Sequence, residues 1–144
     1  MHATCAIWRR HERTTMHLID TDICIDVLRG YKPAVEWLAS LPEPPSLPGF
    51  VIMELIVGCQ NRTEVNCVLA MVKNLPVVWP TPTNLQQALA DFSTHHLRYK
   101  VGVLDALIAA CALGLEATLC TFNTKHFRAI SGLTTEKPYS KSSS

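Results

Sequence analysis

His17-Leu18-Ile19-Asp20-Thr21-Asp22 joins a short apolar segment to an acidic turn. The apolar segment has the length of a buried strand, and apolar residues at helical spacing follow it over 22–29. Strand-like segments return at 77–79 and 117–121, with helical patterns between them. Short apolar strands that alternate with helices predict an α/β fold with a mainly parallel sheet.

The remaining elements are expected from apolar spacing and from helix breakers. Four prolines between 42 and 48 enforce an extended segment, in which a short strand is expected at 46–47. The segment 49–59 is almost entirely apolar, so it is predicted to be a mostly buried helix. Helices are predicted at 22–29, 33–41, 49–59, 63–75, 84–99, 103–113 and 124–130.

Composition indicates one folded domain. The chain has 144 residues, of which 48% are hydrophobic and 17% charged, and its net charge is +1. This composition argues against disorder and gives no overall nucleic-acid signal. Six cysteines without a CxxC pair, in a chain that shows no export signal, are expected to be reduced in the cytosol. No segment approaches the roughly 20 apolar residues of a membrane helix.

The expected domain covers 16–139. Residues 1–15 are interpreted as an N-terminal extension outside the fold, because Met16 directly precedes the first strand and offers an alternative start. A chain that begins at Met16 and fails to fold would contradict this interpretation. Residues 140–144 are expected to be a polar, mobile tail.

Three carboxylates interrupt apolar surroundings. Asp20 ends the first strand, Glu54 lies within the apolar helix, and Asp105 is the only charged residue between Val101 and Leu115. Burying an ionised carboxylate costs several kcal/mol unless it is compensated. Three acids from distant parts of one chain can compensate one another by sharing a divalent cation, which predicts a metal-dependent enzyme that acts on phosphates.

The acidic turn after the first strand has three interpretations. Thr21 or Asp22 can simply cap the helix that follows. An Asp-x-Asp motif after a strand also resembles the aspartyl-phosphate motif of haloacid-dehalogenase-type phosphatases, but the later Asp pair of those enzymes is missing here. In the third interpretation, Asp20 is a metal ligand.

The other two acids also have structural alternatives. Glu54 in a buried helix would be rare without a partner, and Arg62 or Arg98 could supply an ion pair. Asp105 could serve as an N-cap or first-turn acid of its helix. The order of the three acids along the chain is more specific than any one of them.

Taken together, the motifs resemble the PIN domain family, and within it the VapC-type toxins of bacterial toxin–antitoxin pairs. The resemblance covers about 16–139 and is most specific between Asp105 and Phe127. It is carried by Leu18-Ile19-Asp20-Thr21-Asp22, Glu54-Leu55 with Gly58, Leu104-Asp105-Ala106-Leu107-Ile108-Ala109, and Thr121-Phe122-Asn123 with His126-Phe127.

The resemblance implies a three-layer α/β/α sandwich and an endoribonuclease that depends on Mg²⁺ or Mn²⁺. It further implies a homodimer in the cytoplasm, silenced by a cognate VapB-type antitoxin, and cleavage that leaves a 5′-phosphate. Asp20, Glu54 and Asp105 match the family's acidic metal ligands, Asn123 falls where a fourth member sits, and Thr121 matches a frequent hydroxyl position. Oxygen donors without a His or Cys cluster suit Mg²⁺ better than zinc.

The sequence departs from the family in two places. Many relatives carry Ser and Thr just before the Glu helix, where this chain has Pro48-Gly49-Phe50-Val51. Asn123 is neutral, which weakens the case for a tightly held second metal. The alternative function is therefore a PIN-like module that retains the fold, has weak or no activity, and acts by binding another protein.

Partner surfaces are encoded only indirectly. Arg98, Lys100, Lys125 and Arg128 flank the last two motifs and could guide an RNA backbone, or could be ordinary solvated charges. The amphipathic helices predicted at 63–75 and 84–99 could form a groove for an antitoxin segment, or could be ordinary core helices. No motif specifies the RNA target.

Overall fold

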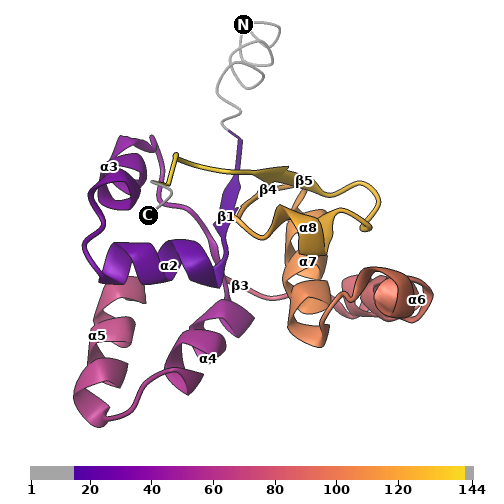
Figure 1. Ribbon diagram of the computed structural model, residues 1–144, viewed down its shortest axis with the longest axis horizontal. Coiled ribbons are helices and arrows are strands. Elements are labelled where there is room, and N and C mark those ends of the chain that lie inside the picture. The colour runs from indigo at the N-terminus through magenta and orange to yellow at the C-terminus, as the bar shows by residue number, and fades with distance from the viewer. Residues whose placement is uncertain (1–14, 142–144) are drawn as a thin grey trace, which may run out of the picture.

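The computed structural model describes residues 15–141 (Figure 1). The predictions made for residues 1–14 and 142–144 lie outside this range. The elements, in chain order, are β1 (His17–Ile19), α2 (Thr21–Leu28), α3 (Lys32–Ser40), β2 (Leu47–Pro48), α4 (Gly49–Val57), α5 (Arg62–Val72), β3 (Val77–Val78), α6 (Pro82–Tyr99), α7 (Val103–Leu115), β4 (Thr118–Cys120), α8 (Thr124–Phe127) and β5 (Thr134–Glu136).

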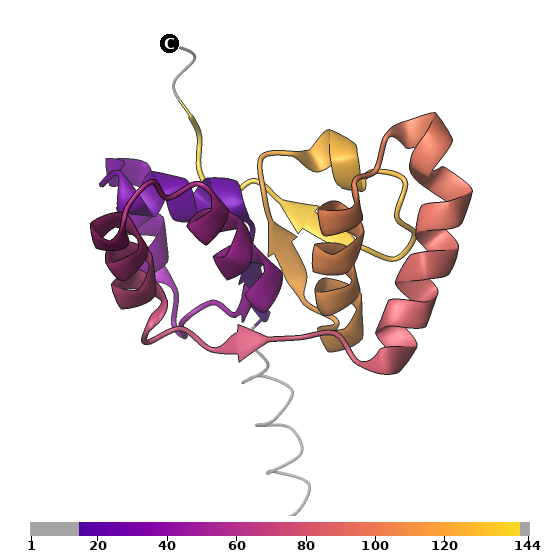
Figure 2. The same cartoon turned by 90° about the horizontal axis from the view of Figure 1, so that it is seen from below.

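All strand pairs are parallel. One sheet has the order β1-β4-β5, a second pairs β2 with β3, and an isolated parallel bridge between Leu18 and Ser46 joins the two. Helices α2 to α5 lie on one side of the larger sheet, and α6 and α7 lie on the other (Figures 1 and 2). This arrangement confirms the predicted α/β/α sandwich with a parallel sheet.

Helix α7 is the most buried helix, and its small side chains explain how. Six of its thirteen residues are buried, and four of the six are alanines. The helix continues through Gly114, where the sequence predicted its end, and α6 lies directly against this position. A Cβ atom at Gly114 would collide with the Asn84 side chain. The chain turns only at Glu116, which takes the left-handed conformation with φ of 53°.

Helix α4 is less buried than its composition predicted. Only Gly49, Val51 and Leu55 are buried, whereas Met53 is 57% exposed and Val57 is 83% exposed. The start of the helix lies against Trp79, the residue after β3, since a Cβ atom at Gly49 would overlap the Trp79 ring. Helix α4 is therefore fixed at its first turn and open to solvent along one side.

Strand β5 was not predicted. Thr134–Glu136 is polar and mostly exposed, so it lacks the apolar run that marks the other strands. Its backbone nevertheless pairs in parallel with β4, and this makes β4 the central strand of the larger sheet. The segment 117–121, which the sequence offered as the final strand, therefore corresponds to β4, and Asn123 lies between β4 and β5.

The segment after β5 crosses back to α2. Tyr139 Oη donates to Asp26 Oδ2 over 2.6 Å, and Lys141 Nζ lies 3.0 Å from the same oxygen. Both side chains also contact the Phe122 ring, Tyr139 edge to face and Lys141 at 4.2 Å from the ring centroid. Lys141, two residues beyond the expected domain end, is thus held against the loop that follows β4.

Two further predictions concern cysteines and membranes. Five of the six cysteines lie in the described part of the chain, and these five are free thiols. No helix of residues 15–141 has the length and apolar character needed to cross a membrane.

Candidate functional site

Asp20 lies directly after β1 and is the only buried carboxylate among residues 15–141. Its Oδ1 accepts a hydrogen bond from the Thr21 backbone N–H, and its Oδ2 accepts one from Thr121 Oγ1, both at 2.8 Å. Asp20 is therefore the N-cap of α2. The prediction that Thr21 or Asp22 caps this helix was wrong by one or two residues.

The surroundings of Asp20 disfavour its negative charge. Burial is the largest cause, the charge of Asp22 adds to it, and the charge of Glu54 contributes a smaller part. Together they raise the pKa of Asp20 to about 6, although the two hydrogen bonds oppose this shift. A buried carboxylate with two acids nearby is stabilised in its ionised form by a cation.

Thr121 connects Asp20 to the loop after β4. Its side chain is fully buried, and its hydroxyl donates to Asp20 while accepting a hydrogen bond from the Asn123 N–H at 3.0 Å. Thr121 and Asp20 are 101 residues apart in the sequence and meet because β1 pairs with β4. The hydroxyl at this position thus fixes the orientation of the Asp20 carboxylate.

Asp22 makes a second connection to the same loop. Its Oδ2 accepts a hydrogen bond from the Phe122 N–H at 2.8 Å, and its Oδ1 accepts one from the Ile23 N–H at 2.9 Å. Burial is the largest cause of a raised pKa for this carboxyl. Asp22 therefore supports the loop rather than facing solvent.

Glu54 is exposed, so the premise that it occupies a buried helix interior was wrong. It accepts a hydrogen bond from Thr21 Oγ1, which lies next to Asp20 in the sequence. Within the described chain it forms no ion pair, and the expected partners Arg62 and Arg98 do not reach it. The contact through Thr21 nevertheless links Glu54 to the residue that directly follows Asp20.

Asp105 occupies the first turn of α7. The sequence had allowed this role as an alternative to metal binding. Its Oδ2 accepts a hydrogen bond from the Gly102 N–H at 3.3 Å and lies 3.5 Å from His126 Nδ1. The side chains are 25% exposed for Asp105 and 54% exposed for His126. The sequence motif contained His126, but its contact with Asp105 was not predicted, because it requires α8 to lie against α7.

The predicted site residues are connected through the β4 loop, but they do not form one compact cluster. The His126 N–H donates to the Asn123 carbonyl, and the Asn123 N–H donates to Thr121, which in turn binds Asp20. Within residues 15–141, no three acidic, His or Cys side chains converge closely enough to enclose a metal ion. The three predicted ligands nevertheless offer carboxylate oxygens, the type of donor that suits Mg²⁺ or Mn²⁺.

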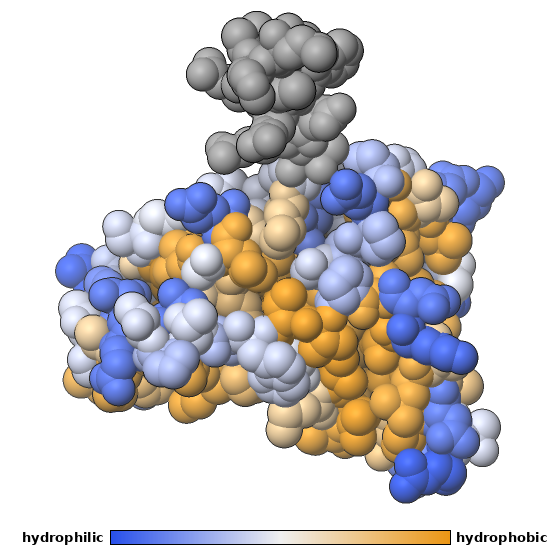
Figure 3. All heavy atoms as spheres, turned by 180° about the vertical axis from the view of Figure 1, so that it is seen from behind, coloured by the Kyte–Doolittle hydropathy of each residue, from blue (hydrophilic) through white to orange (hydrophobic). Residues whose placement is uncertain are grey.

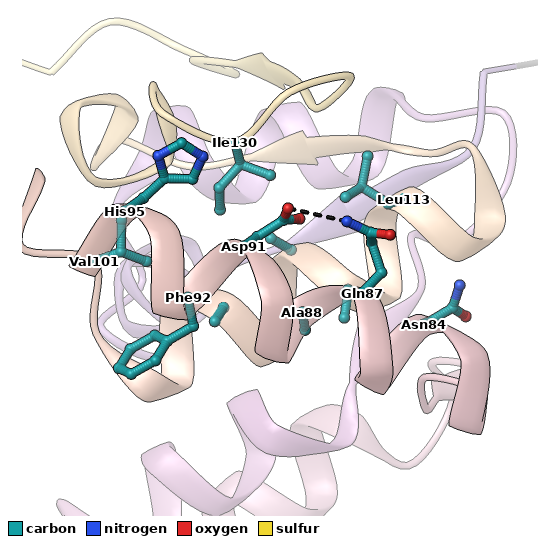
Figure 4. A pocket seen from close by; sticks show the side chains of 12 residues that line it. Asn84, Gln87, Ala88, Asp91, Phe92, His95, Val101, Leu113 and Ile130 are labelled. Atoms are coloured by element: carbon teal, nitrogen blue, oxygen red, sulfur yellow. Dashed lines mark hydrogen bonds between the residues drawn. The ribbon is translucent and has the colours of Figure 1, made fainter.

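A groove of about 590 Å³ opens beside this site. It runs between α2, α4 and α5 and includes Thr21 and Glu54 in its wall, with Leu28, Leu55 and Val68 as apolar lining. A separate cavity of about 80 Å³ lies between α6 and α7 (Figure 4). Its polar rim includes Asp91, which accepts a hydrogen bond from Gln87. None of the predicted site residues lines this second cavity.

Two ribonucleases are similar in sequence to most of this chain. Ribonuclease VapC10 of Mycobacterium tuberculosis (strain ATCC 25618 / H37Rv) is 33% identical over 116 residues, which cover 78% of this chain and 86% of that protein. Ribonuclease VapC19 of the same strain is 32% identical over 118 residues, 78% of this chain and 92% of that protein.

Solved structures show the same fold. A toxin–antitoxin complex from Klebsiella pneumoniae contains a chain that is 26% identical, with a TM-score of 0.70, over 87% of this chain and 99% of that one. DNA-bound VapBC from Salmonella typhimurium also gives a TM-score of 0.70, at 23% identity over 85% of this chain and 98% of that one. The model of the PIN domain family matches residues 17–133. The chain therefore belongs to the PIN domain family.

Proposed function

We propose that this chain is the ribonuclease toxin of a toxin–antitoxin pair and that it hydrolyses RNA phosphodiester bonds with Mg²⁺ or Mn²⁺. The observation that carries this proposal is the buried Asp20, with both oxygens hydrogen-bonded and Glu54 held beside it through Thr21. The relatives named as VapC ribonucleases support the same activity.

Asp20, Glu54 and Asp105 are the residues that would hold the divalent cation. When bound, the cation would supply an activated water and offset the charge that develops on the phosphate. Thr121 keeps the Asp20 carboxylate in one orientation, as expected of a residue that supports a metal ligand. Asn123, exposed at the end of the same loop, offers a neutral amide to the substrate.

Basic residues near the site suit a polyanionic substrate. Lys125 and Arg128 are exposed on and just after α8, and Arg98 and Lys100 are exposed where α6 ends. Lys and Arg side chains at such positions bind phosphates without reading the sequence. These four residues are the proposed contacts to the RNA backbone, and they leave the RNA target open.

The groove between α2, α4 and α5 is the proposed binding site for the antitoxin. It is about 590 Å³ in volume, its lining is partly apolar, and Thr21 and Glu54 stand in its wall. A bound segment there would block access to Asp20. Helix α5 contributes to this groove, as its amphipathic pattern suggested, whereas α6 does not. The relative from Klebsiella pneumoniae was solved as a toxin–antitoxin complex.

A second surface suits a homodimer. Figure 3 shows an apolar area over α4 and α5 on the back of the molecule. Met53, Val57 and Trp79 are each more than half exposed, and apolar patches of this kind commonly mark interfaces between proteins. We infer a homodimer through this surface and a cytoplasmic location, where a ribonuclease toxin meets its RNA.

Cleavage of total RNA by the purified protein tests the proposed function. Discrete fragments are expected with Mn²⁺, and none with EDTA or with the Asp20→Ala variant. Absence of cleavage by the folded, antitoxin-free wild type would contradict the proposal. Calorimetric titration with Mn²⁺ then distinguishes the alternative, because a protein-binding module has no need to bind the metal.

A further inference from the structure

The end of helix α6 carries an exposed aromatic ring between two basic residues. Tyr99 is the last residue of the helix, and Arg98 and Lys100 flank it. The Tyr99 side chain is 41% exposed, and among the described Phe, Trp and Tyr residues only Trp79 is more exposed. Trp79 packs edge to face against Phe50 of α4, whereas the ring contacts of Tyr99 are with side chains of its own helix. The Tyr99 ring is therefore not part of the packing between elements.

Arg98 brings a positive charge to this ring. Its guanidinium carbon lies 5.3 Å from the ring centroid, within the range of a cation–π interaction. Arg98 is exposed and forms no ion pair within residues 15–141. The sequence between Asp91 and Asp105 contains no acid, so no carboxylate of this segment offsets the charge. The end of α6 thus combines an accessible aromatic ring with positive charge.

This surface lies near Asp105. Tyr99 precedes Gly102 by three positions, a connection that spans at most about 11 Å, and the Gly102 N–H donates to Asp105 Oδ2 at 3.3 Å. His96 Nδ1 lies 2.9 Å from the Val101 carbonyl oxygen, a contact that holds the connection against the helix. Figure 2 shows the end of α6, the start of α7 and α8 along the same edge of the molecule. One nucleic-acid strand could therefore contact both Tyr99 and the proposed site.

An aromatic ring with a guanidinium beside it suits unpaired bases. Every base has a flat π-face, so it can stack on an aromatic side chain whatever its identity. Bases in single-stranded RNA can be splayed out for such contacts, whereas those of a duplex are stacked on one another. A cation–π contact at an exposed site is weaker than a base stacked on a ring, so a base can displace Arg98 from Tyr99.

We propose that Tyr99 is a stacking platform for a base of single-stranded RNA bound at the site, and that Arg98 and Lys100 hold the phosphates beside this base. The inference rests on the proposed function, since it names how the ribonuclease site would bind its substrate. Stacking does not depend on base identity, so this contact strengthens binding of single strands without selecting a sequence.

The test measures RNA binding by the full-length protein in the cleavage-defective Asp20→Asn background. The probes are a fluorescent single-stranded RNA and an oligonucleotide of the same length with abasic riboses at every position, which keeps the phosphates and removes the bases. Fluorescence anisotropy should show that the parent protein binds the RNA at least about tenfold more tightly than the abasic probe. Tyr99→Ala should lose most of this preference and bind the abasic probe within about twofold of the parent.

Three further variants make the result specific. Tyr99→Phe keeps the ring and should keep the preference for bases. Leu97→Ala truncates a neighbouring apolar side chain that is 91% exposed, and it should bind both probes as the parent does. Arg98→Gln removes a charge, so it should weaken both probes and make the slope of log affinity against log salt less steep by about 0.7. Tyr99→Ala should leave that slope unchanged.

Two results would overturn the inference alone. They are a preference for bases that persists in Tyr99→Ala, and equal binding of both probes by the parent protein. A wild type that cleaves RNA while Tyr99→Ala keeps the preference would retain the proposed function and remove the stacking platform. A wild type that binds RNA through Tyr99 but cleaves none would contradict the proposed function and support the inference. Absence of binding to either probe would contradict both.

Discussion

Asp20 and Asp105 are both acids of the proposed metal site, but the chain holds them in opposite ways. Asp20 is 5% exposed and its two oxygens accept hydrogen bonds from residues 1 and 101 positions away. Asp105 is 25% exposed at its side chain and contacts only the Gly102 N–H and a half-exposed imidazole. The proposed site therefore has a rigid, desolvated side at Asp20 and an open side at Asp105, where a substrate has room to bind.

The largest expected effect is the loss of cleavage when either acid becomes an amide. Asp20→Asn and Asp105→Asn should each lower the cleavage rate more than about 100-fold. The loss of a residue that only supports a metal ligand lowers the rate by less than this. Cleavage of a fluorescent RNA measures the effect, and circular dichroism shows whether each variant stays folded. Asp91→Asn, which alters a carboxylate of α6, is the matched control. Unchanged cleavage by Asp105→Asn would remove it from the site.

The second largest effect should be on stabilisation by the metal, and it should differ between the Asp20 side and the Asp105 side. Mn²⁺ at about 100 times its Kd should stabilise the wild type by about 2.7 kcal/mol, since only the folded chain forms the site. Thermal unfolding should show most of this gain lost in Asp20→Asn, with a smaller loss in Asp105→Asn, because the exposed acid can be replaced by water. EDTA should abolish the gain. Equal losses in the two variants would contradict the division into a rigid and an open side.

A smaller effect is expected from the hydroxyl that binds Asp20. Thr121→Val keeps the shape of the side chain and removes both hydrogen bonds, so buried Asp20 Oδ2 loses its partner. Urea unfolding should show a loss of about 1–3 kcal/mol in the free energy of unfolding. Thr121→Ser retains the hydroxyl and should lose less, and a Val variant as stable as the wild type would show that the hydroxyl does not support Asp20.

The smallest effect should come from the segment that crosses behind the β4 loop. Tyr139→Phe removes one hydrogen bond to Asp26, but Lys141 still pairs with the same carboxylate. The free energy of unfolding should fall by about 1 kcal/mol. Lys32→Gln, which breaks the exposed pair with Glu36, is the reference and should change stability by less than about 0.5 kcal/mol. A loss in Tyr139→Phe no larger than in Lys32→Gln would exclude a supporting role.

Predictions from the sequence were most accurate for residues whose position depends on a single strand or helix. The alternation of strands and helices predicted the parallel sheet, and an apolar strand followed by Asp20 predicted a buried acid at its end. The burial of Glu54 was wrong because an apolar helix was assumed to be covered all round, whereas α4 leaves one side open. Strand β5 was missed because it is stabilised by backbone pairing rather than by apolar side chains. The contact of His126 with Asp105 depends on the packing of α8 against α7, which has no local signature.

The pairing of β1 with β4 has a consequence for how the activity can be divided. Asp20 and Glu54 lie before the α4–α5 connection, whereas Asp105 and Thr121 lie after it. The chain between β1 and β4 must be closed into a loop, at a cost in conformational entropy, before the contacts between these strands can stabilise it. A nascent chain therefore has no complete active site until Thr121 has been synthesised. A chain divided at Gln60 should give two inactive fragments. If each fragment is fused to one of two proteins that bind each other, their association should bring the fragments together. RNA cleavage would then measure the association of the two fused proteins.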